Sequence, residues 1–266
     1  MNMLSMSYAG VTPHEYAALQ GNDNKIDRVK LREKLTYCSQ LNESLLRRNL
    51  EEKNISFITI EDDLYPELLK EIYDPPYILY YRGDIKILKN PILGVVGSRK
   101  ATTYSRRVLT DILPRFKNKI SIVSGLAYGA DEMAHNISMD SGVTTIGVLA
   151  FGFDFHYPST TKKIREIMEN KYLVISEYPP HTGIDKWRFI ARNRIIAGIS
   201  KGVLVTEAEE KSGSLVTLDM ALNENRFSYC VPGNITSKLS KGTNLRLQEG
   251  AKPVLTADDV LEDFIC

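Results

Sequence analysis

LGVVGSRKATTYS, residues 93–105, joins an apolar run directly to a Gly-Ser-Arg turn. After Pro91 the same pattern, a short run of Val, Ile and Leu that ends in a polar or glycine turn, occurs six times. The six runs read ILGVVGSR, ISIVSGLAYGAD, TTIGVLAFGFD, YLVISEYPP, GVLVTEAEEKSGS and SYCVPGN. Nearly continuous apolar strands that alternate with helix-length stretches indicate a parallel sheet covered by helices on both faces. The sequence therefore predicts an α/β fold with the turns along one edge of the sheet, where ligands bind.

The part of the chain before this pattern is organised differently. Residues 24–54 are highly charged and carry leucines at mostly helical spacing, so they predict two or three short helices. A short β-rich run, the helix-like YPELLKEIY, a Pro75-Pro76 break and the strand-like YILYYRG follow. We expect this segment to extend the main sheet at its edge. The predicted domains are a small helical module, residues 1–54, and an α/β domain, residues 55–266.

Composition limits the cellular setting. A chain of 266 residues can bury a sizeable core. Cys38, Cys230 and Cys266 are odd in number and far apart, so they predict neither a disulfide framework nor a metal-binding knuckle. The start, MNMLSMSYAG, lacks the features of a secretory signal, and no apolar run approaches the roughly 20 residues that cross a bilayer. We expect a cytoplasmic protein with no membrane partner.

Charge is unevenly distributed, although the formal net charge is only +1. Residues 1–90 hold 12 basic and 14 acidic groups, residues 91–200 hold 15 and 9, and residues 201–266 hold 7 and 10. The middle segment therefore carries +6, and a local field of this kind attracts anionic partners. A solvated basic surface explains the same excess equally well.

The Gly-Ser-Arg turn does not match the common nucleotide-binding loops. Gly94 and Gly97 lack GxGxxG spacing, and the second strand ends in Ser124-Gly125, where a dinucleotide fold would place an acid for the ribose. The sequence contains no GxxxxGK[ST] motif. These features disfavour NAD, FAD and a Walker A site, and we predict neither a cofactor nor a metal ion.

The same turn has the chemistry of an anion site. Gly97 permits close approach, the N–H groups that start the next helix attract anions, and Arg99 can hold a phosphate through two parallel hydrogen bonds. Ser98 and Lys100 belong to the same turn. The alternative is a glycine that serves only a tight turn, beside an arginine paired with a neighbouring acid.

Two further turns are predicted to open on the same edge of the sheet. They contain Ser124-Gly125 and Ser212-Gly213-Ser214, at points where helices should begin. Three such turns together indicate a ligand with several phosphates or carboxylates. The serines can equally be helix N-caps, each contributing about 1 kcal/mol to its helix.

The loop FGFDFHYPSTTKK adds aromatic side chains and cations. Phe153, Phe155 and Tyr157 precede Lys162 and Lys163 after the third strand of the sheet. Single-stranded nucleic acid binds such combinations because bases stack on aromatic faces while cations pair with phosphates. Burial of each aromatic ring in the core is the competing interpretation.

A helix is predicted over DKWRFIARNRIIAG, residues 185–198. It places Arg188 and Arg192 four residues apart on one face, with Asn193, Arg194 and Trp187 nearby. These arginines fit phosphate binding and internal salt bridges equally well. We include Arg192, Asn193 and Arg194 among the candidate binding residues.

Taken together, the ordered segments resemble the DNA-processing protein A family (DprA, also called Smf). The resemblance covers about residues 55–260 and rests on YPELLKEIYDPPYILYYRGD, VGSRKATTYS, SGLAYGADEMAH, YPSTT, SEYPP, RNRIIAGIS, EAEEKSGSLVT, VPGN and KGTNLRLQEGA. It implies an extended Rossmann-like domain that binds single-stranded DNA without sequence preference. It also implies a non-catalytic homodimer that protects incoming DNA and loads the recombinase RecA on it during natural transformation.

Family resemblance places DNA contacts on Gly97, Ser98 and Arg99, and on a lysine after the Tyr-Pro segment that Lys162 matches best. Two positions depart from the family pattern, because Tyr128 stands where an arginine is frequent and Thr161 where an asparagine is frequent. These departures concern affinity rather than the kind of ligand.

The alternative function is a nucleotide-binding enzyme of the phosphoribohydrolase type. Glu207 near SGSLVT resembles the glutamate and glycine-rich loop of those enzymes, but their Pro-Gly-Gly-x-Gly-Thr loop is absent from the sequence. Asp131 and His135 are one helical turn apart, as an acid/base pair would be, although a histidine on such a helix is more often structural.

Overall fold

The structure is a computed structural model that describes residues 2–22 and 25–265. Asn24, at the start of the predicted helical stretch 24–54, and Cys266 lie outside the described residues. The strands are β1 (Ser56–Thr59), β2 (Ile78–Gly83), β3 (Ile92–Val96), β4 (Ser121–Ser124), β5 (Thr145–Val148), β6 (Leu173–Ser176), β7 (Gly202–Val205), β8 (Phe227–Cys230) and β9 (Lys252–Pro253).

The helices surround these strands in chain order. The α-helices are α1 (Met3–Tyr8), α2 (Pro13–Leu19), α3 (Arg28–Gln40), α4 (Glu43–Glu52), α5 (Glu67–Lys70), α6 (Thr103–Ile112), α7 (Ala130–Ser141), α8 (Lys162–Lys171), α9 (Lys186–Ile199), α10 (Gly213–Asn223), α11 (Lys241–Gln248) and α12 (Asp258–Ile265). Short 3-10 helices are η1 (Ile85–Lys89), η2 (Leu113–Phe116), η3 (Ser159–Thr161) and η4 (Lys238–Ser240). No helix in the described ranges is long and apolar enough to cross a membrane.

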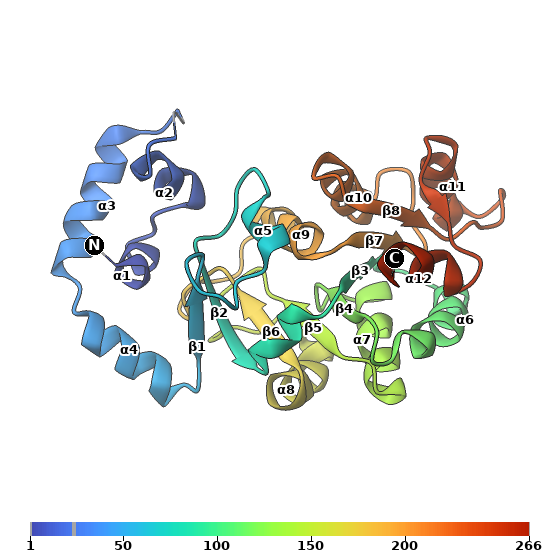
Figure 1. The fold of residues 1–266 in the computed structure, drawn as a ribbon, viewed down its shortest axis with the longest axis horizontal. Helices are drawn as coiled ribbons and strands as arrows, with labels where there is room; N and C mark the ends of the chain where they lie inside the picture. The colour runs from blue at the N-terminus through green and yellow to red at the C-terminus, as the bar shows by residue number, and fades with distance from the viewer. Residues whose placement is uncertain (1, 23–24, 266) are drawn as a thin grey trace.

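One sheet organises the chain, as Figure 1 shows. Its strands follow the order β1-β2-β6-β5-β4-β3-β7-β8-β9. The strands from β6 to β9 in this order are parallel, and β1 and β2 add an antiparallel extension beside β6. The six apolar runs of the sequence correspond to β3 to β8, so the predicted mostly parallel sheet and its edge extension are confirmed.

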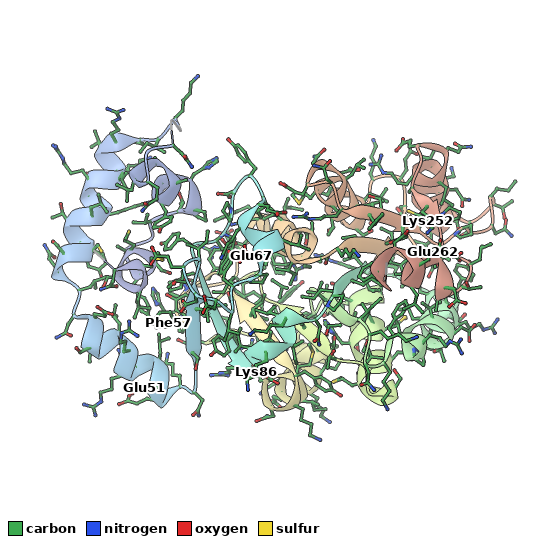
Figure 2. The ribbon with its side chains drawn as sticks, in the orientation of Figure 1. Glu51, Phe57, Glu67, Lys86, Lys252 and Glu262 are labelled. Carbon is green, nitrogen blue, oxygen red and sulfur yellow. The ribbon has the colours of Figure 1, made fainter. Side chains whose placement is uncertain are left out.

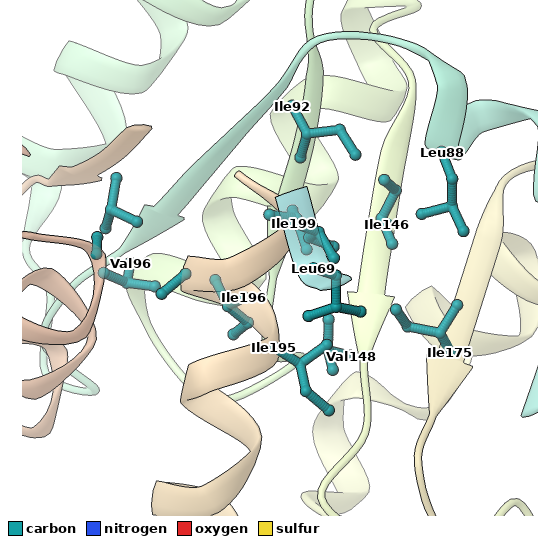
Figure 3. Packing of buried hydrophobic residues seen from close by; sticks show 14 of the residues in the cluster. Leu69, Leu88, Ile92, Val96, Ile146, Val148, Ile175, Ile195, Ile196 and Ile199 are labelled. Atoms are coloured by element: carbon teal, nitrogen blue, oxygen red, sulfur yellow. The ribbon is translucent and has the colours of Figure 1, made fainter. Parts of the chain in front are cut away.

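Helices cover both faces of the sheet because side chains alternate along each strand. On β3, Leu93 and Val95 pack in one cluster with residues of α6, α7 and α12. Ile92 and Val96 of the same strand pack on the opposite face, in a cluster with α5, α9 and α10. Figure 3 shows the isoleucines of α9, Ile196 among them, packed in this second cluster. The α/β fold predicted from the apolar runs is therefore the observed one.

Helices α1 to α4 form an N-terminal arm beside the antiparallel end of the sheet (Figure 1). The arm and the sheet share a buried cluster, and two tyrosines of the sheet side bind the arm directly. The hydroxyl of Tyr77 donates to the Val11 carbonyl at 2.8 Å, and that of Tyr80 donates to Ser7 Oγ at 2.9 Å. The division at residues 54 and 55 falls between α4 and β1, and separate folding of the two parts stays a prediction.

Two helices of the arm lie before the predicted helical stretch. The second, α2, begins with a capping box in which Thr12 and Glu15 bond each other's backbone N–H, with Pro13 at its first turn. This Thr-Pro-x-Glu signal was present in the sequence and identifies the helix start. Figure 2 shows Phe57 of β1 on the side of the sheet that faces the arm, where the Arg47 guanidinium lies 5.0 Å from the ring centroid.

The carboxyl end of β3 is the place in this sheet where a binding crevice is expected. This strand pairs with β4 on one side and with β7 on the other. The chain leaves β3 toward α6 on one face and enters β7 from α9 on the other. Connections that diverge to opposite faces open a crevice beyond the carboxyl ends of such strands.

Candidate functional site

A crevice of about 450 Å³ lies at the carboxyl end of β3. Its walls are the turn 97–100, the start of α7, one side of α9 and the segment 209–217 at the start of α10. We call this cavity the crevice. Nine predicted residues line it: Gly97, Ser98, Arg99, Lys100, Arg192, Asn193, Ser212, Gly213 and Ser214. Six do not: Ser124, Gly125, Phe155, Lys162, Lys163 and Arg194.

Gly97 is required by packing at the floor of the crevice. A Cβ atom there would lie 2.7 Å from Ala130 Cβ and 2.7 Å from Thr206 Oγ1, closer than real Cβ contacts. The neighbouring turn is equally close, since Gly129 has a φ of +76° and packs on the Ser98 carbonyl. The glycines thus bring the ends of β3 and β7 and the start of α7 together.

Two of the three helix N-termini at this edge bind oxygen atoms from distant segments of the chain. At α6 the Glu207 carboxylate accepts from the Thr102 backbone N–H at 2.7 Å and from the Ser105 hydroxyl at 2.7 Å. At α7 the Ala130 N–H donates to the Ser98 carbonyl at 3.2 Å. One backbone N–H at the start of each of α6 and α7 is therefore satisfied within the protein, and anion binding at these two turns stays a prediction.

The third terminus, that of α10, faces the crevice. Ser212 caps the helix by accepting from the Ser214 N–H at 3.4 Å, and its hydroxyl also lies 2.8 Å from that of Ser214. A Cβ atom built on Gly213 would meet nothing within 4 Å. The N-cap interpretation of Ser212 is confirmed, and the backbone beside it remains open to the crevice.

Arg192 is buried and has a structural role, so it is not a cation free to bind a ligand. Its Nη1 donates to the carbonyls of Gly125 at 2.6 Å and Val148 at 2.7 Å. Burial lowers its pKa to about 10, while nearby Asp131 raises it and Arg99 lowers it. Burial likewise raises the pKa of the Asp131 carboxyl, which Arg192 lowers. The pair holds the turn after β4 in place beneath the crevice, and Gly125 lacks a Cβ because Arg192 occupies that space.

Two predicted residues are engaged elsewhere. Arg194 binds Glu177 through both terminal nitrogens at 2.7 Å and contacts Asp74 at 3.2 Å. Ser124 is fully buried, and its hydroxyl donates to the Val95 carbonyl at 2.7 Å. Ser124 is not a helix N-cap either, since α7 begins at Ala130. We therefore leave Ser124 and Arg194 out of the candidate site.

Arg99, Lys100 and Lys211 supply the unpaired positive charge of the crevice. They line it, and none forms an ion pair within the described part of the chain. Two acidic residues, Asp131 and Glu209, also line the crevice. Arg192 offsets the charge of Asp131, so Glu209 is the acid that remains beside the three cations. Lys211 was not among the predicted binding residues, although it directly precedes Ser212. The local signal of this turn is its serines and glycine, and a lysine beside them carries no motif of its own.

The aromatic loop between β5 and α8 adjoins the crevice. Phe153 is buried beneath the guanidinium groups of two arginines, so its ring belongs to the core. Phe155 and Tyr157 are 38% and 43% exposed. The Tyr157 ring lies 5.6 Å from that of Phe189, a residue that lines the crevice. This contact places the exposed ring of Tyr157 next to the crevice.

Lys162 and Lys163 continue the same edge. They begin α8 directly after the aromatic loop and are exposed. Lys162 lies 4.0 Å from Glu166, a long contact between two exposed groups. Strands β3 and β5 are two positions apart in the sheet, so their carboxyl ends are separated by roughly 10 Å. Arg99 and Lys162 therefore follow strands whose ends lie on one edge of the sheet, with β4 between them.

The titratable pair suggested for catalysis is structural. His135 is fully buried, and its Nδ1 lies 2.8 Å from Thr145 Oγ1. Burial lowers the pKa of His135 to about 3, so the ring is neutral. Asp131 accepts from the Gly125 N–H at 3.1 Å. Among residues 2–22 and 25–265, no group of three His, Cys, Asp or Glu residues could hold a metal ion.

Comparison with known proteins agrees with this architecture. DNA processing protein DprA of Streptococcus pneumoniae is 43% identical over 206 residues, which are 77% of this chain and 73% of the relative. The X-ray structure of DprA from that species matches 98% of this chain and 96% of its own, with 34% identity and a TM-score of 0.87.

A second solved structure is that of DNA processing protein A from Helicobacter pylori, which describes a single-stranded DNA binding mode of that protein. It matches 79% of this chain and 97% of its own, with 29% identity and a TM-score of 0.71. The model of the DNA recombination-mediator protein A family matches residues 56–265, from the first strand of the sheet into the last helix. The chain belongs to the DNA recombination-mediator protein A family.

Proposed function

We propose that this chain binds single-stranded DNA in the crevice without sequence preference. The observation that carries the proposal is the group of three cations, Arg99, Lys100 and Lys211, that line a concave edge without ion-pair partners in the described residues. Lysine and arginine contacts to phosphates provide affinity but carry no base information. The Helicobacter pylori relative is described as binding single-stranded DNA.

Exposed aromatic side chains favour a single strand over a duplex. Tyr157 presents ring surface beside the crevice, Phe155 is exposed on the same loop, and unpaired bases stack on such rings in a sequence-tolerant way. In a duplex the base faces are already stacked on one another, so the rings gain little. The phosphate path runs from the crevice cations along the edge to Lys162 and Lys163.

The test compares single-stranded and double-stranded oligonucleotides of several sequences by fluorescence anisotropy. We expect tighter binding of the single strand, equal affinity across sequences, and a similar loss for every sequence in Arg99→Ala and Lys162→Glu. Circular dichroism of both variants controls for folding. Unchanged affinity of the double variant would exclude the proposed path.

We further propose that the bound strand is passed to a RecA-type recombinase during natural transformation, by a cytoplasmic homodimer. Family membership supports this role, since the family is described as a recombination mediator. Light scattering should give twice the 30.0 kDa of one chain. Recombinase should assemble faster on single-stranded DNA that carries this protein, and an unchanged assembly rate would contradict the transfer.

We also propose that the chain acts without catalysis. The glutamate considered for phosphoribohydrolase activity, Glu207, is buried and engaged by Thr102 and Ser105. Its carboxylate is thus committed to the start of α6. Incubation with adenosine monophosphate should release no adenine, and release that is lost in Glu207→Gln would establish the enzyme instead.

A further inference from the structure

A second cavity, of about 510 Å³, lies between the N-terminal arm and the start of α9. Its walls combine residues 7–14 of the arm, the segment 177–182 after β6, and Trp187 and Arg188 of α9. We call it the arm cavity. Its size is in the range of pockets that hold small organic ligands, roughly 300–1,000 Å³. Nothing in the proposed function uses it.

Aromatic rings line the arm cavity from several elements. Tyr8 comes from the arm, Tyr77 precedes β2, Tyr178 follows β6, and Trp187 belongs to α9. Trp187 is 57% exposed. The centroids of its ring and of the Tyr178 ring lie 5.2 and 5.3 Å from the Arg188 guanidinium, which contacts both rings. Flat apolar surfaces of this kind suit a planar ring.

The charges of the arm cavity largely cancel. Arg194 is bound to Glu177 and contacts Asp74, so one cation faces two acids. Arg188 supplies the second cation and donates to the Gly183 carbonyl. The crevice, in contrast, has an excess of unpaired cations. A phosphate is therefore favoured in the crevice, and a neutral aromatic group in the arm cavity.

Two polar atoms of the cavity residues add hydrogen-bonding capacity. Asp74 Oδ1 and Arg188 Nε are buried and have no hydrogen-bond partner in the described part of the chain, although Asp74 Oδ1 lies 3.7 Å from His14 Nδ1. One is an acceptor and the other a donor. Pockets that take an unstacked nucleobase combine aromatic faces with such groups for the edge of the base.

Helix α9 connects the two cavities. Ile190 lines the crevice, and Trp187 lines the arm cavity. They are three residues apart and therefore adjacent on the helix surface, and Ile190 is also 47% exposed. An exposed apolar strip thus runs from one cavity to the other, over about 4.5 Å along the helix axis.

We propose that the arm cavity is a base subsite, in which a nucleobase of the same single strand stacks on Trp187 after the strand leaves the crevice over α9. This inference rests on the proposed function, because the crevice must first hold the phosphate backbone. The ligand class is an unpaired nucleobase carried by a polynucleotide. An aromatic side chain of a protein partner could occupy the arm cavity in the same way, and the test must distinguish it from a nucleobase.

The test uses the fact that Trp187 is the single tryptophan of the chain. Its emission is recorded while the wild-type protein is titrated with an oligonucleotide, and binding is followed separately by anisotropy of a labelled copy. An abasic oligonucleotide of the same length serves as the matched ligand, since it has the same phosphates and no bases. We expect the intact strand to quench Trp187 at saturation and the abasic strand to leave it nearly unchanged.

Variants give a second readout. Trp187→Ala should weaken binding of the intact strand about fivefold, the low end of the effect of base–aromatic stacking, because Trp187 is half exposed. Trp187→Phe should retain most of the affinity. Tyr37→Ala removes a ring that is 52% exposed on α3, outside both cavities, and should change nothing.

The outcomes separate the inference from the proposed function. Tight binding with unchanged Trp187 emission, or equal quenching by the abasic strand, would overturn the base subsite and leave the crevice proposal standing. Absence of binding in the anisotropy measurement would overturn both. Wild-type affinity of a folded Trp187→Ala variant would also overturn the base subsite.

Discussion

Lys211→Ala tests how the crevice obtains its affinity. Lys211 is exposed, lines the crevice and forms no ion pair in the described residues, so its removal should leave the fold unchanged. Each phosphate that a cation neutralises on a single strand contributes about −0.7 to the slope of log K against log salt. Three crevice cations therefore give a slope of about −2.1, and the variant should give about −1.4.

These slopes translate into affinities that are easy to distinguish. Between about 50 and about 200 mM salt, the wild-type affinity should fall about 18-fold and that of Lys211→Ala about sevenfold. Additional contacts at Lys162 and Lys163 would steepen both slopes without changing their difference. Anisotropy titrations of one labelled oligonucleotide over a salt series provide the measurement.

Lys86→Ala is the matched control. Lys86 is exposed in η1, which precedes β3, so it lies at the edge of the sheet opposite the crevice (Figure 2). The control removes the same charge from the protein and should keep the wild-type slope. Equal slopes for wild type and Lys211→Ala, or equal changes in Lys211→Ala and Lys86→Ala, would refute the assignment of phosphate binding to the crevice.

Three further predictions concern the scaffold beneath the site. Arg192→Met leaves two carbonyls buried without a donor and should lower the free energy of unfolding by about 3 kcal/mol in urea titration; a loss below about 1 kcal/mol would contradict the structural role. Gly97→Ala should lower the melting temperature because its Cβ would meet atoms at 2.7 Å, whereas Gly213→Ala, with open space, should not; equal melting temperatures of the two variants would argue against tight packing. His135 has its pKa lowered to about 3, so the unfolded chain binds the proton more readily and stability should fall by about 2 kcal/mol from pH 7 to pH 5. His135→Gln should lack this fall in the same titration, and an identical pH profile would rule out His135 as its source.

The sheet could be predicted from the sequence because its signal is local. Each of the six apolar runs is nearly continuous and ends at a turn, and a strand buried on both faces produces this pattern without regard to its neighbours. The turns at Gly97 and Gly213 were found for the same reason. Helices α1 and α2 were missed because they are short, and a capping box such as that at Thr12 was the local signal for one of them.

The state of each arginine could not be predicted, because it depends on distant partners. Arg99, Arg192 and Arg194 have the same chemistry in the sequence. Arg194 is bound by Glu177, 17 residues away, and by the carbonyl of Asp74, 120 residues away. Only the fold decides which guanidinium meets a carboxylate, which meets a buried carbonyl, and which remains free for a ligand.

The helix N-termini explain why side-chain charge contributes more to the proposed binding than backbone N–H groups do. The sequence pattern predicted three anion receptors, but Glu207 occupies the terminus of α6 and the Ser98 carbonyl that of α7. An internal carboxylate at such a terminus satisfies the N–H groups and cancels part of the helix dipole. The remaining attraction for a polyanion then comes from the start of α10, which stays open to the crevice, and above all from the side chains of Arg99, Lys100 and Lys211. Flexible cations on a solvated edge follow a phosphate backbone of any sequence and release counterions as they do so. A site built in this way is expected to be strongly salt-dependent and indifferent to base sequence, which suits a protein that must accept whatever strand it meets.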